Sequence, residues 1–201
     1  MAKYPPTAVV SYRFSVMGKD SKSYDFMIAE LGSDRLSLLK DFRCDSEEQD
    51  RYLQEKAWNE QRYGLNKTLL FLKDGAVWGY VTYGTYRIHN PRPKGWHEEK
   101  GISDYGPEPV LHIGQFAIAR PYQGMGLGSE LLRFVKYHLV RIAFEIGTVG
   151  ISLFCVMDDK GERRVSFYER NGFSKLSEKP SDDDRIQMFY PFDKVFSRVY
   201  V

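Results

Sequence analysis

The most informative stretch of this chain is Gln123-Gly124-Met125-Gly126-Leu127-Gly128-Ser129. It follows an apolar segment, Val110 to Ile118, that predicts a strand, and it precedes a segment with helical periodicity, Ser129 to Ile146. Glycine at every second position keeps side chains away from the strand-to-helix turn, so backbone N–H groups can approach an anion. The helix N-terminus adds unpaired N–H groups and the positive end of its dipole. We therefore expect this stretch, called the glycine loop below, to bind a diphosphate.

Two common phosphate-binding patterns do not fit the glycine loop. A Walker loop ends in Gly-Lys-Ser/Thr, because the lysine and the hydroxyl serve the terminal phosphates and magnesium, whereas this loop ends in Gly128-Ser129. In the dinucleotide fingerprint the third glycine comes one position later, and an acidic residue follows at the end of the next strand. Glu145 lies at a suitable distance but falls inside the predicted helix. Nucleoside triphosphates and dinucleotides are therefore not the expected ligands.

The composition suits one domain with an ordinary apolar content and many aromatic residues. The 201 residues carry a formal net charge of +2, which is not the strongly basic footprint of a dedicated nucleic-acid binder. Cys44 and Cys155 are far apart, so we expect two unpaired thiols and a cytoplasmic protein. The histidines show no metal-ligand spacing, and we expect no metal. Residues 1–10 do not predict a signal peptide, and no segment is long enough to cross a membrane.

The segments around the glycine loop predict a mixed α/β fold. Further strands are expected at residues 24–31, 67–72, 77–86, 150–157, 173–176 and 185–192. Asp74-Gly75 predicts a hairpin turn, because such turns need positive φ angles. Helices are expected from Asp45 or Ser46 to about residue 62 and over 161–171, with a short one at 33–41.

Two segments depart from this pattern. Residues 1–23 predict an N-terminal extension or an extra strand, and residues 24–201 predict a single domain. The segment from Arg87 to Pro109 is rich in proline and glycine, and a loop of this length in a compact domain is usually functional or disordered. A tolerated surface insertion is the equal alternative. With Trp96, His97 and Tyr105 it could form the wall of a substrate pocket.

A second run, Val165-Ser166-Phe167-Tyr168-Glu169-Arg170-Asn171-Gly172-Phe173, lies in the helix after the strand 150–157. A phenol has a pKa of about 10, so the hydroxyl of Tyr168 stays protonated at neutral pH and can give a proton to a forming thiolate. In isolation, the aromatic pair of Phe167 and Tyr168 would as readily belong to the core.

Together the two runs resemble the GNAT superfamily of acetyl-coenzyme A-dependent N-acetyltransferases. That family has a Q/R-x-x-G-x-G/A loop for the coenzyme A diphosphate and a late helix with an F-Y-E-x-x-G-F run. The resemblance implies a mixed sheet of about six to seven strands, with an antiparallel N-terminal meander and a splayed parallel pair around the helix after the glycine loop. It also implies acetyl-CoA as the cosubstrate and direct attack of a primary amine, without an acyl-enzyme.

The resemblance also implies the site residues. The cofactor-binding residues would be Phe116, Ala117 and Ile118 of the strand and Gln123, Gly124, Met125, Gly126, Leu127, Gly128 and Ser129 of the glycine loop. The backbone of the strand would pair with pantetheine, and the N–H of Ile118 would polarise the thioester oxygen. Tyr168 would be the catalytic general acid. Glu108, His112 and Gln115 lie near the strand, but we assign no base.

One position departs from the family pattern. Many relatives carry an asparagine about one turn before the F-Y pair, whereas this chain has Asp158-Asp159 and then Arg163-Arg164. The two arginines could reach a coenzyme phosphate, although solvated helix surface is the preferred interpretation.

A narrower resemblance, at Phe42-Arg43-Cys44, Gly79-Tyr80 and Tyr122-Gln123-Gly124, is to a branch that includes bacterial toxins which acetylate aminoacyl-tRNA. Those toxins tend to be more basic, and they usually have Asp and Gly at the positions of Arg43 and Asp45. We therefore expect a small-molecule or protein amine as the acceptor, with tRNA as an alternative partner that is not favoured. A non-catalytic module that binds acetyl-CoA is the third hypothesis, and a homodimer is a further option. A basic groove for tRNA would draw on Arg13, Lys22, Arg62, Arg87, Arg92 and Lys94.

Overall fold

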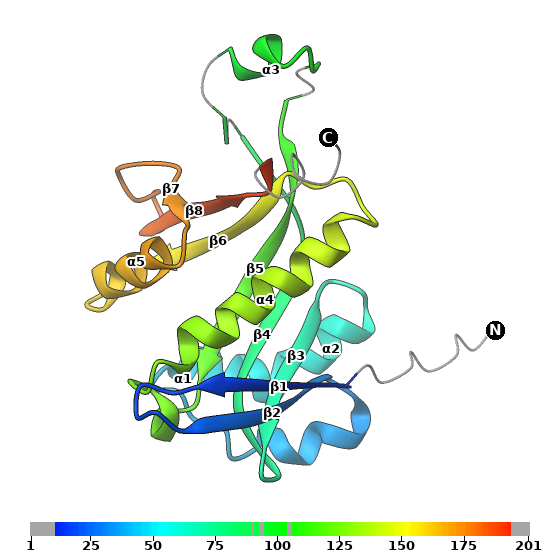
Figure 1. The fold of residues 1–201 in the computed structure, drawn as a ribbon, viewed down its shortest axis with the longest axis vertical. Coiled ribbons are helices and arrows are strands. Elements are labelled where there is room, and N and C mark those ends of the chain that lie inside the picture. The colour runs from blue at the N-terminus through cyan, green and yellow to red at the C-terminus, as the bar shows by residue number, and fades with distance from the viewer. Residues whose placement is uncertain (1–10, 90, 93–94, 104–105, 194–201) are drawn as a thin grey trace, which may run out of the picture. The chain divides into compact units, whose positions relative to one another are not determined.

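The computed structural model describes residues 11–89, 91–92, 95–103 and 106–193 (Figure 1). The strands are β1 (Ser11–Met17), β2 (Ser23–Glu30), β3 (Lys67–Lys73), β4 (Ala76–Ile88), β5 (Glu108–Ile118), β6 (Gly150–Val156), β7 (Ser174–Lys175) and β8 (Arg185–Pro191). The α-helices are α1 (Glu47–Arg51), α2 (Ala57–Arg62), α3 (Trp96–Glu99), α4 (Leu127–Ala143) and α5 (Gly161–Arg170). Two 3₁₀ segments, η1 (Ser33–Leu39) and η3 (Arg120–Tyr122), and one π-helical segment, η2 (Tyr52–Lys56), complete the described elements.

Within the described ranges, the strands form one mixed sheet in the order β1-β2-β3-β4-β5-β6-β8-β7. This confirms the expected α/β fold with an antiparallel N-terminal meander and a parallel pair. The sheet has eight strands, more than the expected six to seven, because β1 pairs with its edge. Contacts divide the chain into two compact units, the described parts of Met1–Tyr83 with Gly114–Leu132 (unit 1) and of Gly84–Ile113 with Arg133–Val201 (unit 2).

In unit 1, β1 to β3 and the first part of β4 form the meander. β1 pairs with β2 along its whole length, from Ser11↔Ala29 to Met17↔Ser23, so the described end of the N-terminal segment is an added strand. Residues 1–10 of this predicted N-terminal segment lie outside the described residues. Asp74 and Gly75 join β3 to β4 with φ angles of 51° and 76°, which confirms the predicted hairpin turn.

The core of unit 1 lies between this meander and the helices that follow β2. Leu39 of η1, Leu53 of η2 and Ala57 of α2 are buried in one cluster with Leu70 and Tyr80 of the sheet. The predicted single helix from residue 46 to about 62 is thus present as α1, η2 and α2 in succession. Ser46 is its N-cap, and its hydroxyl accepts a hydrogen bond from the N–H of Gln49 at 3.4 Å.

In unit 2, β5 and β6 form the parallel pair with the register Leu111↔Ile151 to Ile113↔Leu153, and β5 continues beyond that register to Ile118. β6 then pairs antiparallel with β8, from Gly150↔Pro191 onward. The predicted strand 173–176 is reduced to the two residues of β7.

α4 differs from its predicted range of 129–146 at both ends. It begins at Leu127, and it ends at Ala143, after which the N–H groups of Phe144 and Glu145 bond to carbonyls three residues back. The helical spacing of apolar residues predicts which side chains face the sheet: of these, Leu127, Leu131, Val135 and Leu139 are buried, and Ile142 is half-buried. Ile146, which we expected to face the sheet, is 41% exposed because it lies past the end of the helix.

Candidate active site

The end of β5 lies close against β4 in unit 1. Thr82 Oγ1 accepts a hydrogen bond from the N–H of Gln115 at 2.9 Å, and the carbonyl of Trp78 accepts one from Ala119 at 2.8 Å. A Cβ atom at Gly79 would lie only 2.7 Å from the Ala117 carbonyl oxygen, so glycine is required there. Of the expected pantetheine-binding residues, Ala117 is buried, whereas Phe116 and Ile118 are half-buried. The strand that precedes the glycine loop is therefore held firmly in place.

The first part of the glycine loop is fastened by side chains. The ring of Tyr122 stacks on the ring of Trp78, with centroids 3.3 Å apart and planes at 5°. The side-chain amide of Gln123 donates to the carbonyls of Cys44 and Ile118, both at 2.9 Å. Gln123, expected to bind the cofactor, thus uses its side chain to hold the loop, and only its backbone remains for a ligand.

The glycines of the loop have backbone geometry that other residues rarely adopt. Gly124 and Gly126 have φ angles of 78° and 83°, in the left-handed region. A Cβ atom at Gly124 would have no neighbour within 4 Å, so this side of the loop is open. Because α4 begins at Leu127, the end of the glycine loop runs into the first turn of the helix, where the positive end of the helix dipole lies. The loop and the helix end together fit an anionic group.

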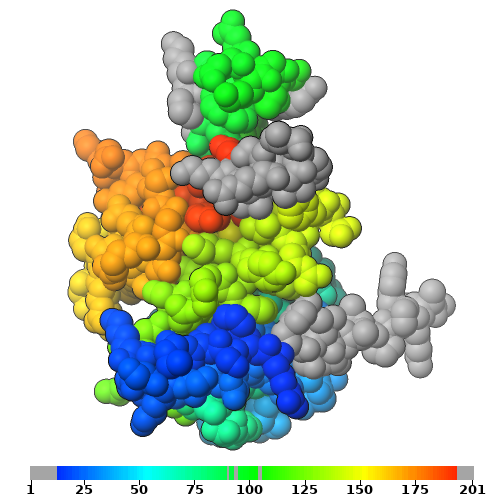
Figure 2. Space-filling view, viewed as in Figure 1, coloured from blue at the N-terminus to red at the C-terminus, as the bar shows by residue number. Residues whose placement is uncertain are grey.

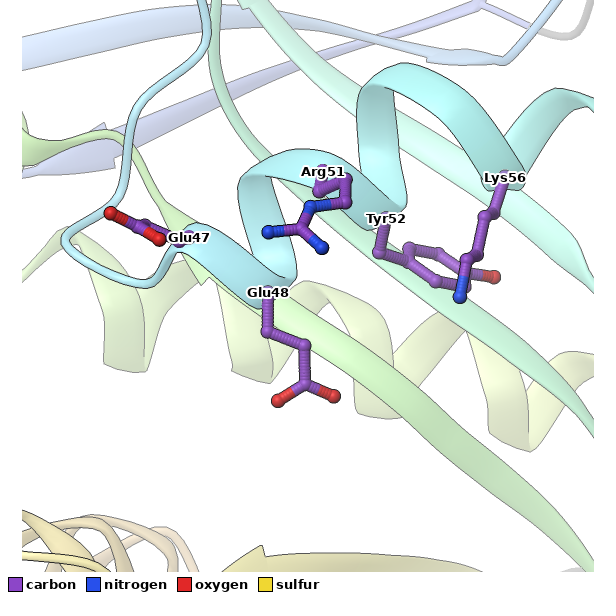
Figure 3. Close-up of a pocket in the computed structure, with 5 residues that line it drawn as sticks. All are labelled: Glu47, Glu48, Arg51, Tyr52 and Lys56. Atoms are coloured by element: carbon purple, nitrogen blue, oxygen red, sulfur yellow. The ribbon is translucent and has the colours of Figure 1, made fainter.

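An open pocket of about 330 Å³ lies on the outer side of α1 and η2, also in unit 1 (Figure 3). It is lined by Glu47, Glu48, Arg51, Tyr52 and Lys56. Figure 3 shows these side chains projecting from one continuous helical segment. The sequence analysis did not identify this pocket. Residues 46–62 have only a partial apolar stripe in the sequence, because the wider π turn of η2 shifts the helical phase, and no motif there indicates a pocket.

The pocket helix is tied to its own unit by polar side chains. The hydroxyl of Tyr52 donates to Glu60 at 2.7 Å and accepts from Asn66 at 2.8 Å. Burial and this contact with Glu60 raise the pKa of Tyr52, so its hydroxyl stays protonated. Gln49 accepts from the hydroxyl of Tyr80 at 2.9 Å and donates to Gln115 of β5 at 3.2 Å.

In unit 2, Tyr168 lies on α5 among aromatic rings. Its ring centroid is 5.1 Å from that of Phe167 and 5.6 Å from that of Phe173, both in edge-to-face geometry. Burial, with a smaller contribution from nearby Cys155, raises the pKa of Tyr168 above its ordinary value. The phenol therefore carries its proton at neutral pH, which is the form that a general acid needs.

The connection from β6 to α5 is held by one arginine. Arg164 forms a two-pronged ion pair with Asp158, with both N···O distances 2.7 Å, and donates to the carbonyl of Val156 at 2.8 Å. The hydrogen bonds from Arg164 lower the pKa of Asp158 to about 2. Arg164 is thus engaged by Asp158 and the backbone, whereas Arg163 is exposed.

The two titratable candidates for a base are engaged elsewhere in unit 2. The ring of His112 lies 2.8 Å from the hydroxyl of Ser152, and burial lowers its pKa to about 4. An imidazole with so low a pKa holds a proton poorly. The carboxylate of Glu108 lies 3.5 Å from Arg92 and 3.3 Å from His97.

Contacts with Glu108, the first residue of β5, also hold part of the segment from Arg87 to Pro109 in place. The side chain of Arg92 is only 6% exposed and also pairs with Asp193. Its guanidinium lies 4.4 Å from the ring centroid of Trp96. Arg92 therefore cannot line a basic groove, and Arg87 donates to the carbonyl of Pro107 at 2.9 Å. Two further residues of the sequence analysis, Lys94 and Tyr105, lie outside the described residues.

In the described ranges, no helix combines the length and the apolar character needed to cross a bilayer. The same ranges contain no group of three or more His, Cys, Asp or Glu side chains that could hold a metal ion.

Comparison with known proteins gives consistent matches. Residues 35–173 match the family described as acetyltransferase (GNAT) family. A tRNA-acetylating toxin of Mycobacterium tuberculosis (strain ATCC 25618 / H37Rv) is 28% identical over 118 residues, which cover 59% of this chain and 69% of the toxin. The structure of AtaT complexed with acetyl-methionyl-tRNAfMet has a TM-score of 0.71 at 20% identity, covering 88% of this chain and all of AtaT. The structure of AtaTR bound with acetyl-CoA has a TM-score of 0.67 at 21% identity, covering 88% of this chain and 98% of that one.

These relatives correct one expectation. We did not favour tRNA as a partner, but the curated relative is a tRNA-acetylating toxin and AtaT was solved with an acetylated methionyl-tRNA, so that preference is wrong. The family match covers more than half of the chain and includes both the glycine loop and the run around Tyr168. This chain therefore belongs to the acetyltransferase (GNAT) family and is an N-acetyltransferase.

Proposed function

We propose that this protein transfers the acetyl group of acetyl-CoA to the α-amino group of an aminoacyl-tRNA. The observation that carries this proposal is the sequence similarity to a tRNA-acetylating toxin, 28% over 118 residues. The likeness in fold to AtaT with its acetylated tRNA is consistent with it. The alternative of a small-molecule or protein amine has no comparable support.

The glycine loop is the part of the chain that fits the coenzyme. In this proposal, the backbone N–H groups of the loop and of the first turn of α4 bind the diphosphate. The open side of Gly124 and the positive φ of Gly126 support this role. Phe116, Ala117 and Ile118 supply the backbone that pairs with pantetheine. Bound acetyl-CoA supplies an acetyl group that is activated as a thioester.

Tyr168 is the proposed general acid. The protonated amine first gives one proton to water, which frees the lone pair of its nitrogen. As this nitrogen bonds to the acetyl carbon and the carbon–sulfur bond breaks, Tyr168 gives its proton to the departing sulfur, and the nitrogen loses a second proton to water. The role rests on the match with the tyrosine of the family's F-Y-E-x-x-G-F run and on the raised pKa of this phenol. The N–H of Ile118 stabilises the charge on the thioester oxygen.

The pocket on α1 and η2 is the proposed site for the charged end of the tRNA. An aminoacylated 3′ end carries phosphates and an amino group, and the pocket offers groups for both. Arg51 and Lys56 match the phosphates, and Glu47 and Glu48 match the amino group in its protonated form. Arg13 and Arg62 are exposed in the same unit and can add phosphate contacts.

Acetyl transfer from radiolabelled acetyl-CoA tests the proposed function. The full chain is incubated separately with charged tRNA, uncharged tRNA, free amino acids and a lysine peptide, and the labelled product is quantified. We expect label only in the aminoacyl fraction of charged tRNA, released when the ester is hydrolysed. Transfer to free amino acids or to the peptide at a similar kcat/KM would contradict the proposal.

A further inference from the structure

The turn between β1 and β2, residues 18–22, has a well-defined shape. The N–H of Gly18 bonds to the carbonyl of Lys22 at 2.9 Å, and the N–H of Ser21 bonds to the carbonyl of Gly18 at 3.0 Å. Asp20 accepts from the N–H of Lys22 at 3.2 Å and from the hydroxyl of Tyr24 at 2.7 Å. The turn is therefore fixed internally. Figure 2 shows the β1–β2 hairpin, in blue, at the surface.

This turn contacts the glycine loop directly. The N–H of Lys19 donates to the carbonyl of Met125 at 2.9 Å. A Cβ atom at Gly126 would lie 2.9 Å from Lys19 Cγ and 3.6 Å from both Cδ and Cε. The side chain of Lys19 thus runs along the bare backbone of Gly126, where an added methyl group would collide with it. Glycine at position 126 therefore leaves room for the side chain of Lys19 and also allows the positive φ angle.

The charge of Lys19 is available at this position. Lys19 is exposed, and within the described residues its ammonium group makes no ion pair. The adjacent carboxylate, Asp20, is held by Tyr24 and by the backbone of Lys22. A lysine beside an anion-binding loop adds a point charge to the dipoles of the backbone.

We infer, on the basis of the proposed function, that Lys19 is a further ligand of coenzyme A and that its ammonium group pairs with the diphosphate bound by the glycine loop. We assign the ammonium group to the diphosphate rather than to the 3′-phosphate because the aliphatic part of the Lys19 side chain lies against Gly126, in the middle of that loop. The turn at residues 18–22, which precedes the predicted domain, is then part of the coenzyme site, and β1 has a role in binding because it leads into this turn.

Titration calorimetry on the full chain tests this inference with two probes, coenzyme A and 3′-dephospho-coenzyme A. Lys19→Met keeps the apolar stem and removes the charge, and we expect it to raise Kd about five- to tenfold for both probes. Raising the salt concentration should reduce the difference in Kd between Lys19→Met and the wild type. Lys19→Arg should stay near the wild type. The matched control is Lys22→Met, which removes an exposed lysine from the same turn.

The results separate the inference from the proposed function. An equal loss for the two probes, with Lys22→Met unchanged, supports pairing with the diphosphate. A loss confined to coenzyme A would assign Lys19 to the 3′-phosphate and overturn the inference. Unchanged affinity of Lys19→Met for both probes would also overturn it, while binding by the wild type would leave the proposed function standing. If the wild type binds neither probe, both fail. Unfolding curves check that the variants remain folded.

Discussion

The glycine loop in unit 1 is shaped by hydrogen bonds and backbone geometry, whereas Tyr168 in unit 2 is shaped by its aromatic surroundings. Gln123 bridges two carbonyls, and Gly124 and Gly126 adopt positive φ angles. Around Tyr168, two rings pack edge to face, and burial raises the pKa of the phenol. A defect in the loop should therefore weaken coenzyme binding, and a defect at Tyr168 should slow the chemical step.

The largest expected effect separates these two roles. Tyr168→Phe keeps the aromatic packing and removes only the hydroxyl, so we expect kcat to fall about 100-fold or more, as for loss of a general acid. The affinity for acetyl-CoA should change less than twofold, because the proposed binding groups are elsewhere. Single-turnover kinetics and calorimetry measure the two quantities.

The control for this variant is Tyr137→Phe, on the exposed side of α4, where the residue is 64% exposed. It should leave both quantities unchanged. A Tyr168→Phe enzyme with wild-type turnover would remove the acid role, and one that loses affinity and rate together would show that the ring positions the coenzyme.

The second prediction concerns burial in unit 2 and its effect on stability. Burial lowers the pKa of His112 to about 4, against about 6.5 in an unfolded chain. Below pH 6.5 the unfolded state binds a proton that the folded state does not, so stability falls as the pH drops toward 4. From pH 7.5 to pH 5, this residue should cost about 2 kcal/mol of unfolding free energy.

Urea unfolding of the wild type and of His112→Gln at the two pH values tests this effect. The glutamine variant should lose most of this pH dependence, whereas His89→Gln, at an exposed position, should retain it. Equal pH dependence in the wild type and His112→Gln would show that other groups cause the acid sensitivity.

Features set by local chemistry could be predicted from the sequence, and features set by distant contacts could not. Asp74-Gly75 predicts its turn because the two residues themselves favour positive φ, and Ser46 caps its helix for an equally local reason. The π turn of η2 was not predicted, because its shift of helical phase reads as a weak apolar pattern. The bond from Gln123 to the Cys44 carbonyl joins residues 79 positions apart, which no local pattern encodes.

In the candidate site, too, local motifs could be predicted from the sequence, whereas contacts between distant residues could not. The glycine spacing and the run around Tyr168 are short motifs, so they could be read directly. Arg92 looked like a member of a basic groove, but the fold buries it against Glu108 and Asp193. The contact between Lys19 and Gly126 depends on the turn that follows β1, a strand that the sequence left open.

The smallest expected effect is a difference in unfolding free energy between alanine substitutions at the two glycines, Gly124 and Gly126. An alanine at either position adopts a positive φ, which costs about 1–2 kcal/mol. At Gly124 nothing else stands in the way, whereas at Gly126 the new Cβ also meets Lys19 Cγ at 2.9 Å. Gly126→Ala should therefore destabilise the protein by about 0.5–1 kcal/mol more than Gly124→Ala. Because Lys19→Ala removes Cγ, this excess should vanish in the Lys19→Ala background, and urea unfolding of the wild type and the five variants completes the comparison. An excess that persists there would mean that the backbone around Gly126, rather than the lysine, demands glycine.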